Sequence, residues 1–347
     1  MRILFTNNAF AHRGGSEMAV LDLAKRLKRK GHLPVAYSQE LGEVANELVH
    51  SGIPVISDLD ALQEQPDVIH GHHHLETMAA CLHFSGVPAI YVCNGWLPWH
   101  ELPPTFPTIM TYVGVGDVTR ERIVTSVRLD GRPAIVVPTF FDEDLFQPKH
   151  EISASARRAL IYSNTLTGKD KLVKDIAAAC AKRHISLDTY GLASGKTTAR
   201  PDALLLTYDV VFAVGRSAVE AMACGCAVVV CDKSGIAGMA QPGDFTGEGR
   251  NKLKLNERSL EQISSSTIGE QLDLYDASRI ALVRDEIRAQ RSLGSAVARF
   301  EEIYADAIAR FPESGAREPA RLLDDASRYI RSLAAILKHM RSPAPEA

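Results

Sequence analysis

Segment 209–232 holds the residues with the clearest chemical pattern in this chain. An apolar run ends at the turn Gly215-Arg216-Ser217-Ala218, a helix-forming run follows, and a second apolar run begins at residue 227. A helix that starts at such a turn presents backbone N–H groups and the positive end of its dipole to one point, where an anion can bind. Glu220, about one turn into the helix, could accept hydrogen bonds from a sugar or ribose hydroxyl. The alternative is a buried strand–helix pair with Glu220 merely solvated.

A second candidate anion turn, Gly14-Gly15-Ser16, stands between the first apolar run and the first helical pattern. Glycine lets a backbone approach a phosphate closely, and the Ser16 hydroxyl could cap the helix. The alternative is a plain helix cap with two turn glycines. We favour the anion-binding interpretation of this turn.

The run 70–74 contains four histidines and one glycine, a composition that invites comparison with metal sites. Alternate residues of an extended chain point to the same side, so His72 and His74 could share a ligand while His73 could not. No cysteine or carboxylate stands at a conventional ligand spacing nearby, and we therefore expect no metal. We assign His72 to catalysis and His70 to the acceptor side of the site.

Asn94 ends the next apolar run, and a proline-rich loop with Trp96, Trp99 and His100 follows it. Asn94 can hydrogen-bond a sugar hydroxyl, but an amide cannot carry a proton near neutral pH. The rings of the loop could stack on an acceptor sugar. A loop held in place by buried aromatic residues is the equal alternative.

Strand-like and helix-like patterns alternate along residues 3–137, break at the proline-containing segment 138–150, and then restart. Repeated βα units predict doubly wound parallel sheets. The restart predicts two Rossmann-like domains that face each other across a cleft, with ligands at the carboxyl ends of the strands. We assign residues 1–140 to the first domain, 141–311 to the second, and 312–347 to a C-terminal extension.

The sequence EAMACG at 220–225 and the VVV run after it resemble the donor-binding motif of family 4 glycosyltransferases, enzymes of the GT-B fold. Three earlier stretches, GGSEMAVLDLAKRLKRKGHLPVAYS, PDVIHGHHH and VVPTFFDEDLFQP, resemble the same family in the same order. With the helices before Phe311, the resemblance spans residues 1–311.

This resemblance implies transfer of a sugar from a nucleotide-diphospho sugar, in particular a UDP-sugar, to an acceptor hydroxyl, with retention of configuration and without a metal or other cofactor. It implies that Glu220 holds the ribose hydroxyls and that residues 215–218 face the diphosphate and sugar. It also implies that the loop with Gly14, Gly15 and Ser16 either closes over the donor's diphosphate or orients the acceptor. The departing phosphate itself would accept the proton of the acceptor.

Three positions differ from the family pattern. Phe212 stands where the family has a glutamate, Asn94 where it often has a histidine, and Asn164 where it has an arginine. Lys169 matches the lysine of the diphosphate clamp, and we expect Arg216 to replace the missing arginine. We assign Lys169 and Asn94, together with His72, to catalysis. Two alternatives remain open: a non-catalytic nucleotide-sugar-binding subunit and a nucleotide-sugar epimerase. Phe212 and Asn94 speak against the epimerase, which needs groups for proton abstraction.

Composition narrows the class of protein. The chain has 347 residues, of which 46% are hydrophobic and 23% charged, as expected for two soluble domains. A net charge of −3 leaves no basic surplus for nucleic acid. No run of about eighteen apolar residues predicts a membrane span. The six cysteines lie in helix or strand patterns, which predicts a reduced, cytoplasmic protein.

Residues 317–341 form a separate amphipathic pattern. Apolar residues recur at three- and four-residue steps, and basic residues cover much of the other side. The apolar stripe consists of Leu322, Ala326, Tyr329, Leu333, Ile336 and Met340. We predict a homodimer formed partly by this helix. Packing on its own chain, or a surface anchor near a lipid-linked acceptor, are the alternatives.

Overall fold

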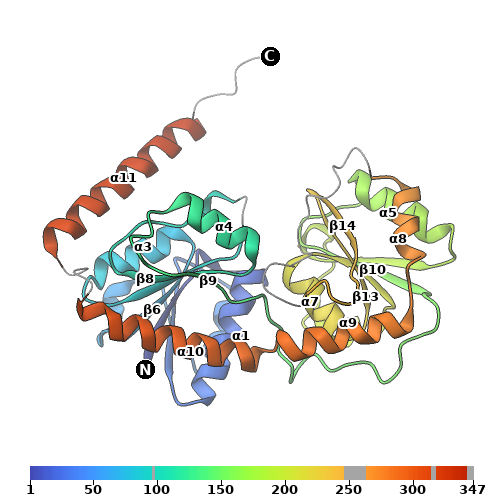
Figure 1. Ribbon diagram of the computed structural model, residues 1–347, viewed down its shortest axis with the longest axis horizontal. Helices are drawn as coiled ribbons and strands as arrows, with labels where there is room; N and C mark the ends of the chain where they lie inside the picture. The colour runs from blue at the N-terminus through green and yellow to red at the C-terminus, as the bar shows by residue number, and fades with distance from the viewer. Residues whose placement is uncertain (96–97, 246–262, 314–317, 342–347) are drawn as a thin grey trace. The chain divides into compact units, whose positions relative to one another are not determined.

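The computed structural model divides the chain into two units, Met1–Val137 with Val297–Ala347, and Pro138–Ala296 (Figure 1). The structure describes residues 1–95, 98–245, 263–313 and 318–341. The division corrects the expected boundary at residue 311, because helix α10 (Leu293–Arg310) packs its Phe300 and Tyr304 rings against His70 of the first unit. The extension beyond residue 312 also groups with the first unit.

The first unit contains a seven-stranded sheet in which every neighbouring pair is parallel. Its strand order is β5 (Val55–Ile56), β3 (Leu33–Tyr37), β1 (Arg2–Thr6), β6 (Val68–His72), β7 (Ala89–Cys93), β8 (Ile109–Gly114) and β9 (Ala134–Val136). Apolar, mostly β-branched and aromatic strands buried on both faces are what a parallel sheet requires.

Helices cover both faces of this sheet. Helix α3 (His74–His83) and helix α4 (Asp117–Ser126) share a core cluster with Leu4, Ile69 and Tyr91. Side chains alternate along a strand, so Phe5 and His70 point to the other face, where α10 lies. Helix α1 (Gly15–Arg29) packs against helix α2 (Glu43–His50) within the same unit.

Helix α11 (Pro319–Arg341) packs one side on its own unit. Leu322, Ala326 and Tyr329 join the cluster beneath α3 and α4. Part of the stripe that the sequence assigned to a dimer contact is therefore covered within the chain. Three other apolar side chains of α11 are exposed: Leu323, Ile330 and Leu337.

The second unit contains a five-stranded sheet ordered β11 (Ser186–Tyr190), β10 (Arg158–Tyr162), β12 (Val210–Ala213), β13 (Ala227–Asp232) and β14 (Gly235–Met239). All pairs are parallel except the edge strand β14. Helices α7 (Gly215–Ala223) and α9 (Ala277–Gln290) pack on one face, and α5 (Lys171–Ala181) and α8 (Ser265–Leu272) on the other.

Both sheets have a point where the chain reverses its direction of winding. In the first unit the strands after β1 extend to one side and those after β6 to the other, so the switch lies between β1 and β6. In the second unit it lies between β10 and β12. Open α/β sheets bind ligands outside the carboxyl ends of strands at such points. The residues that follow these four strands are therefore the ones to examine.

Two further expectations concern environment. All six cysteines are buried free thiols. In the part of the chain that the structure describes, no helix combines the length and the apolar character needed to cross a bilayer.

Candidate active site

The turn after β12 carries the strongest candidate residues of the second unit. Gly215 begins α7 with φ +62°, a conformation that suits glycine, and the helix cap residue Val214 makes no side-chain capping bond. Arg216 Nε donates to Glu220 Oε1 at 2.7 Å, and both side chains are only 9% exposed. The Arg216 guanidinium also lies 5.7 Å from the Phe140 ring centre. The two residues expected to hold the diphosphate and the ribose thus form one nearly buried ion pair.

The loop after β10 lies at the neighbouring strand end, because β10 and β12 pair in parallel. Asn164 is exposed, and its Oδ1 accepts the Leu192 N–H at 3.1 Å, which joins this loop to the one after β11. Lys169 is exposed just before α5, in a turn that Asp170 holds through the Thr167 N–H and hydroxyl. The Lys169 loop and the Arg216 turn therefore both lie at the carboxyl ends of the strands of this sheet.

Phe212 aligns with a glutamate that binds the donor in the family, but in this structure its side chain is enclosed within the unit. It lies within β12, is fully buried, and packs in the cluster shared with α5 and α8. Side chains at alternate positions of β12 face opposite layers of helices, and that of Phe212 faces the layer formed by α5 and α8. Phe212 is therefore a core residue.

The turn after β1 differs from expectation at Ser16. The cap position of α1 is Gly14, and the Ser16 hydroxyl donates to Glu17 Oε2 at 2.8 Å instead of capping the helix. A Cβ at Gly14 would lie 2.4 Å from the same carboxylate oxygen, so the Glu17 side chain lies directly against Gly14 and would have to move if this glycine were replaced. A carboxylate therefore stands at the positive end of α1, where the sequence predicted a bound anion.

His70 is enclosed by the rings of Phe5, Phe300 and Tyr304, which corrects its assignment to the acceptor side. It is fully buried, stacks on His72 at 4.8 Å, and its Nδ1 lies 2.5 Å from the Tyr304 hydroxyl. Burial lowers the pKa of His70 to about 3, because no anion compensates the lost hydration of the charged form. His70 is a neutral core residue.

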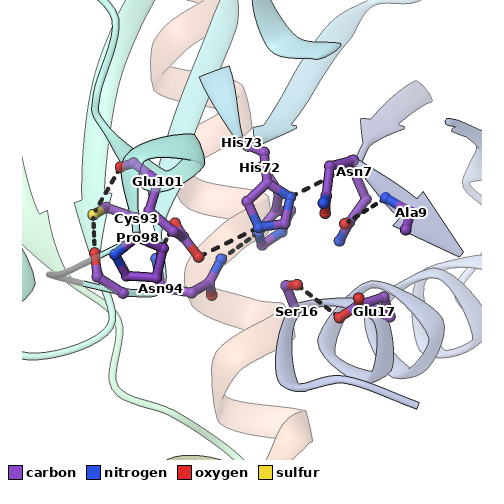
Figure 2. A network of polar contacts seen from close by, with 12 residues as sticks. Asn7, Ala9, Ser16, Glu17, His72, His73, Cys93, Asn94, Pro98 and Glu101 are labelled. Atoms are coloured by element: carbon purple, nitrogen blue, oxygen red, sulfur yellow. Dashed lines mark hydrogen bonds and ion pairs between the residues drawn. The ribbon is translucent and has the colours of Figure 1, made fainter. Parts of the chain in front are cut away.

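His72 and Asn94 are joined, as their assignment to one site requires. Asn94 Nδ2 lies 2.8 Å from His72 Nδ1, which places the amide as donor and the ring nitrogen as acceptor (Figure 2). His72 is 1% exposed, and burial holds its pKa well below the usual value. His72 is therefore a neutral ring with its proton on Nε2.

Glu101 is a candidate residue that the sequence did not reveal. It is 4% exposed, its Oε2 accepts the Asn94 N–H at 2.9 Å, and its Oε1 lies 3.4 Å from His73 Nε2. Arg122 of α4 holds the same loop by donating to the carbonyls of Gly95 and Pro98. The only signal in the sequence was an acid in the loop after Asn94, and nothing in its spacing connected it to the histidine run.

His73, His100 and Glu101 are the described residues whose possible ligand atoms cluster, all within 4.8 Å of one another. The Asn8 N–H donates to His73 Nδ1 at 3.1 Å, so the proton of a neutral His73 lies on Nε2, facing Glu101. Metal-bound histidines normally show the opposite, with the second nitrogen donating to an acceptor. The donor pattern at His73 suits a histidine–carboxylate contact better than a metal.

The loop aromatics pack against the start of α3. The Trp99 and His74 rings meet edge to face at 4.9 Å, and His74 Nδ1 lies 2.8 Å from the Tyr329 hydroxyl of α11. Trp99 is still 38% exposed, and the half-buried His100 ring meets His73 at 4.9 Å. Trp96 lies outside the described residues.

No protein-family model and no curated protein matches the sequence. Solved structures do match the fold. Anabaena HepE, in complex with UDP-glucose, superposes with a TM-score of 0.63 at 14% identity, over 88% of this chain and 100% of HepE. The spinosyn forosaminyltransferase SpnP matches with 0.50 at 16% identity, over 88% and 99%. S. aureus MnaA, in a co-structure with UDP, matches with 0.52 at 12% identity, over 86% and 95%.

The chain has the GT-B fold. Each of its two Rossmann-like units contains a mainly parallel sheet with one switch point, as this fold requires. In each unit of this GT-B chain, polar side chains gather beside the switch point: Asn7, His72 and Asn94 in one, and Lys169, Arg216 and Glu220 in the other.

Proposed function

We propose that this protein is a glycosyltransferase of the family 4 kind, which transfers a sugar from a nucleotide-diphospho sugar, in particular a UDP-sugar, to an acceptor hydroxyl. One observation carries the proposal: the Arg216–Glu220 pair at the start of α7, beside the switch point of the second sheet. The likeness in fold to HepE in complex with UDP-glucose supports it.

In this proposal the second unit binds the donor. Glu220 accepts hydrogen bonds from the ribose hydroxyls, while the N–H groups of residues 215–218, with Arg216 and Lys169, hold the diphosphate. The bond between the anomeric carbon and the phosphate oxygen breaks, and the acceptor oxygen bonds to that carbon. The phosphate oxygen takes the acceptor's proton, and configuration is retained. Stabilisation of the leaving anion is then the main contribution of the protein.

This mechanism needs no strong side-chain base. Neutral His72 and Asn94 would act as hydrogen-bonding groups, which agrees with the low pKa that burial imposes on His72. We also propose that transfer is independent of metal, a proposal supported by the donor pattern at His73. Activity after treatment with a chelator and gel filtration should equal that of untreated protein. Activity lost on chelation and restored by a divalent ion would contradict it.

A non-catalytic nucleotide-sugar-binding subunit is the second candidate, favoured by the burial of Phe212 in the core. Purified protein incubated with UDP-glucose separates the two. Release of UDP, slowed in a Glu220→Ala variant, supports the transferase. Binding of UDP-glucose without release of UDP over hours, alone or with sugar acceptors, supports the binder.

We further propose that the protein forms a homodimer through α11. The side of α11 that remains exposed carries Leu323, Ile330 and Leu337 at seven-residue steps, a spacing that suits a helix–helix seam. Replacing the three by serine should convert a dimer into a monomer in light scattering, because the packed side with Leu322 and Tyr329 is left intact. Wild-type protein that is monomeric at micromolar concentration would contradict the dimer, and binding to lipid vesicles would favour a surface anchor for a lipid-linked acceptor.

A further inference from the structure

We propose that Asn7 and His72 form a subsite for sugar hydroxyls, which Asn94 and the positioning residue Glu101 hold in place. This inference rests on the proposed glycosyl transfer and deepens it. Asn7 directly follows β1, and nothing in the motif pattern of the sequence singles it out.

Sheet register places the residues side by side. Strands β1 and β6 pair in parallel with Thr6 opposite Gly71, so the next residues, Asn7 and His72, are neighbours at the carboxyl ends. Strand β7 pairs with β6 with Val92 opposite His72. Because side chains alternate, Asn94 two residues later returns to the face of His72. Neighbouring strands are about 4.8 Å apart, a spacing at which one sugar ring can meet both side chains.

The chemistry of the row follows from its hydrogen bonds. Asn7 is fully buried and its Oδ1 accepts the Ala9 N–H, while Nδ2 is buried without a partner. His72 Nδ1 accepts from Asn94, and its Nε2–H is likewise buried without a partner among the described residues. A buried donor without an acceptor destabilises the folded protein unless a ligand or a bound water molecule supplies the acceptor.

Both groups are donors and neither is charged. Uncharged N–H donors suit the oxygens of neutral hydroxyl groups, whereas a phosphate is better served by the cationic turn at Arg216. The row therefore fits a sugar rather than the diphosphate.

Glu101 acts through its neighbours. Its two carboxylate oxygens join the Asn94 main chain to His73, and His73 adopts φ +61° at the cap of α3. A non-glycine residue in this conformation persists only where its surroundings enforce it. Asn8 N–H and Glu101 supply that enforcement, because they contact the two different nitrogens of the His73 ring. Figure 2 shows Glu101 beside His73. The ends of β1, β6 and β7 are thereby linked through one buried carboxylate.

The test compares UDP, UDP-glucose, and glucose with UDP present, as ligands of the full-length protein in calorimetry. Asn7→Ala and Asn7→Asp should each leave the affinity for UDP unchanged. A loss of about fivefold or more for UDP-glucose assigns the subsite to the transferred sugar, and a similar loss for glucose assigns it to the acceptor. Thr108→Val is the matched control, because Thr108 is equally buried but precedes β8, at the amino ends of the strands.

Glu101→Ala should reproduce the loss seen with His72→Ala, and the two changes should be non-additive. Glu101→Gln should restore part of the affinity, because an amide oxygen can still accept the Asn94 N–H. Folded variants, judged by circular dichroism, with wild-type affinity for both UDP-glucose and glucose would overturn the subsite. Wild-type protein that binds no nucleotide would instead overturn the proposed function. Glucose binding that depends on Asn7 would then still support the subsite, and its absence would overturn that as well.

Discussion

The two switch points of this molecule differ in the charged groups that lie beside them. At the start of α7 in the second unit, Arg216 lies beside the helix N-terminus, paired with Glu220. At the start of α1 in the first unit, the carboxylate of Glu17 takes that place, beside Gly14. A helix N-terminus favours anions in both, and at α7 the guanidinium of Arg216 adds a cation for an incoming phosphate. The difference favours the second unit for the nucleotide diphosphate and the first for neutral hydroxyl groups.

The units also differ in how they treat histidine. The first buries all four histidines of the run 70–74, with exposed fractions of 0–3%. In the second, His150 and His184 are exposed. Acid should therefore act on the two units unequally, because burial keeps His70, His72 and His74 neutral while the unfolded chain takes up protons.

The largest predicted effect is loss of stability of the first unit below pH 6.5. The pKa of His70 is lowered to about 3 and that of His74 to about 4, and the pKa of His72 is lowered well below 6.5, all mainly by burial. Since the unfolded state binds these protons first, stability is highest above pH 6.5 and falls toward pH 4.5. Each such histidine contributes a slope of about 1.4 kcal/mol per pH unit.

Denaturation followed by tryptophan fluorescence checks this, because both tryptophans, Trp96 and Trp99, belong to the first unit. The midpoint should shift steeply between pH 6.5 and 4.5 in the wild type and less steeply in His70→Phe. His184→Phe, at an exposed site of the second unit, is the control. Equal acid sensitivity of both units in hydrogen exchange, corrected for the intrinsic rate, would contradict the comparison.

The next effect concerns Glu220. Its replacement by alanine should weaken nucleotide binding by about 1.5–3 kcal/mol, the range for a hydrogen bond to a charged group. Isothermal calorimetry with UDP measures it, and Glu270→Ala, an exposed acid in α8 of the same unit, is the control. Unchanged affinity for each nucleotide that the wild type binds would show that Glu220 only pairs with Arg216.

Arg216 and Lys169 provide a test of the cationic switch point. Each change to alanine should reduce the affinity for UDP about tenfold, an effect of about 1.4 kcal/mol, and leave the affinity for uridine nearly unchanged. The double variant should show coupling, since both cations would contact one diphosphate. Lys171→Ala is the control, because Lys171 is exposed and paired with Asp175. Equal losses for uridine and UDP would show that neither side chain contacts the phosphates.

Much of the fold could be predicted from the sequence, and the reasons are physical. The alternation of apolar strands with helical stripes specifies parallel βα units, and the break at residues 138–150 marked the passage to the second unit. The return of α10 to the first unit could not be predicted, because it depends on Phe300 and Tyr304 meeting a histidine far away in the chain. A helical stripe shows that a face is buried, but not against what.

The candidate site shows the same limit. His72 is the last residue of β6, and Asn94 directly follows β7. Because these successive strands are neighbours in the sheet, the proximity of the two residues could be predicted. Glu101 and Glu17 were missed because their roles depend on loop geometry: Glu101 reaches back to Asn94 and His73, and Glu17 folds over Gly14. Local spacing predicts which residues share a strand end, whereas the path of a loop is decided by contacts that no local pattern records.

The smallest predicted effect tests the acidic switch point. If Glu17 keeps anions away from the start of α1, Glu17→Gln should raise the affinity for UDP by about 0.3–1 kcal/mol, the size of a charge effect at an exposed helix end. Ser16 can still donate to the amide oxygen, so the turn should keep its shape. Calorimetry at low and high salt should show the gain shrinking as salt screens the charge. A loss of affinity would mean that Glu17 helps to bind the ligand, because its carboxylate positions the Ser16 hydroxyl. No change at low salt would mean that α1 lies away from the phosphates. Of the two turns, the one at the start of α7 would then be the one that binds the diphosphate.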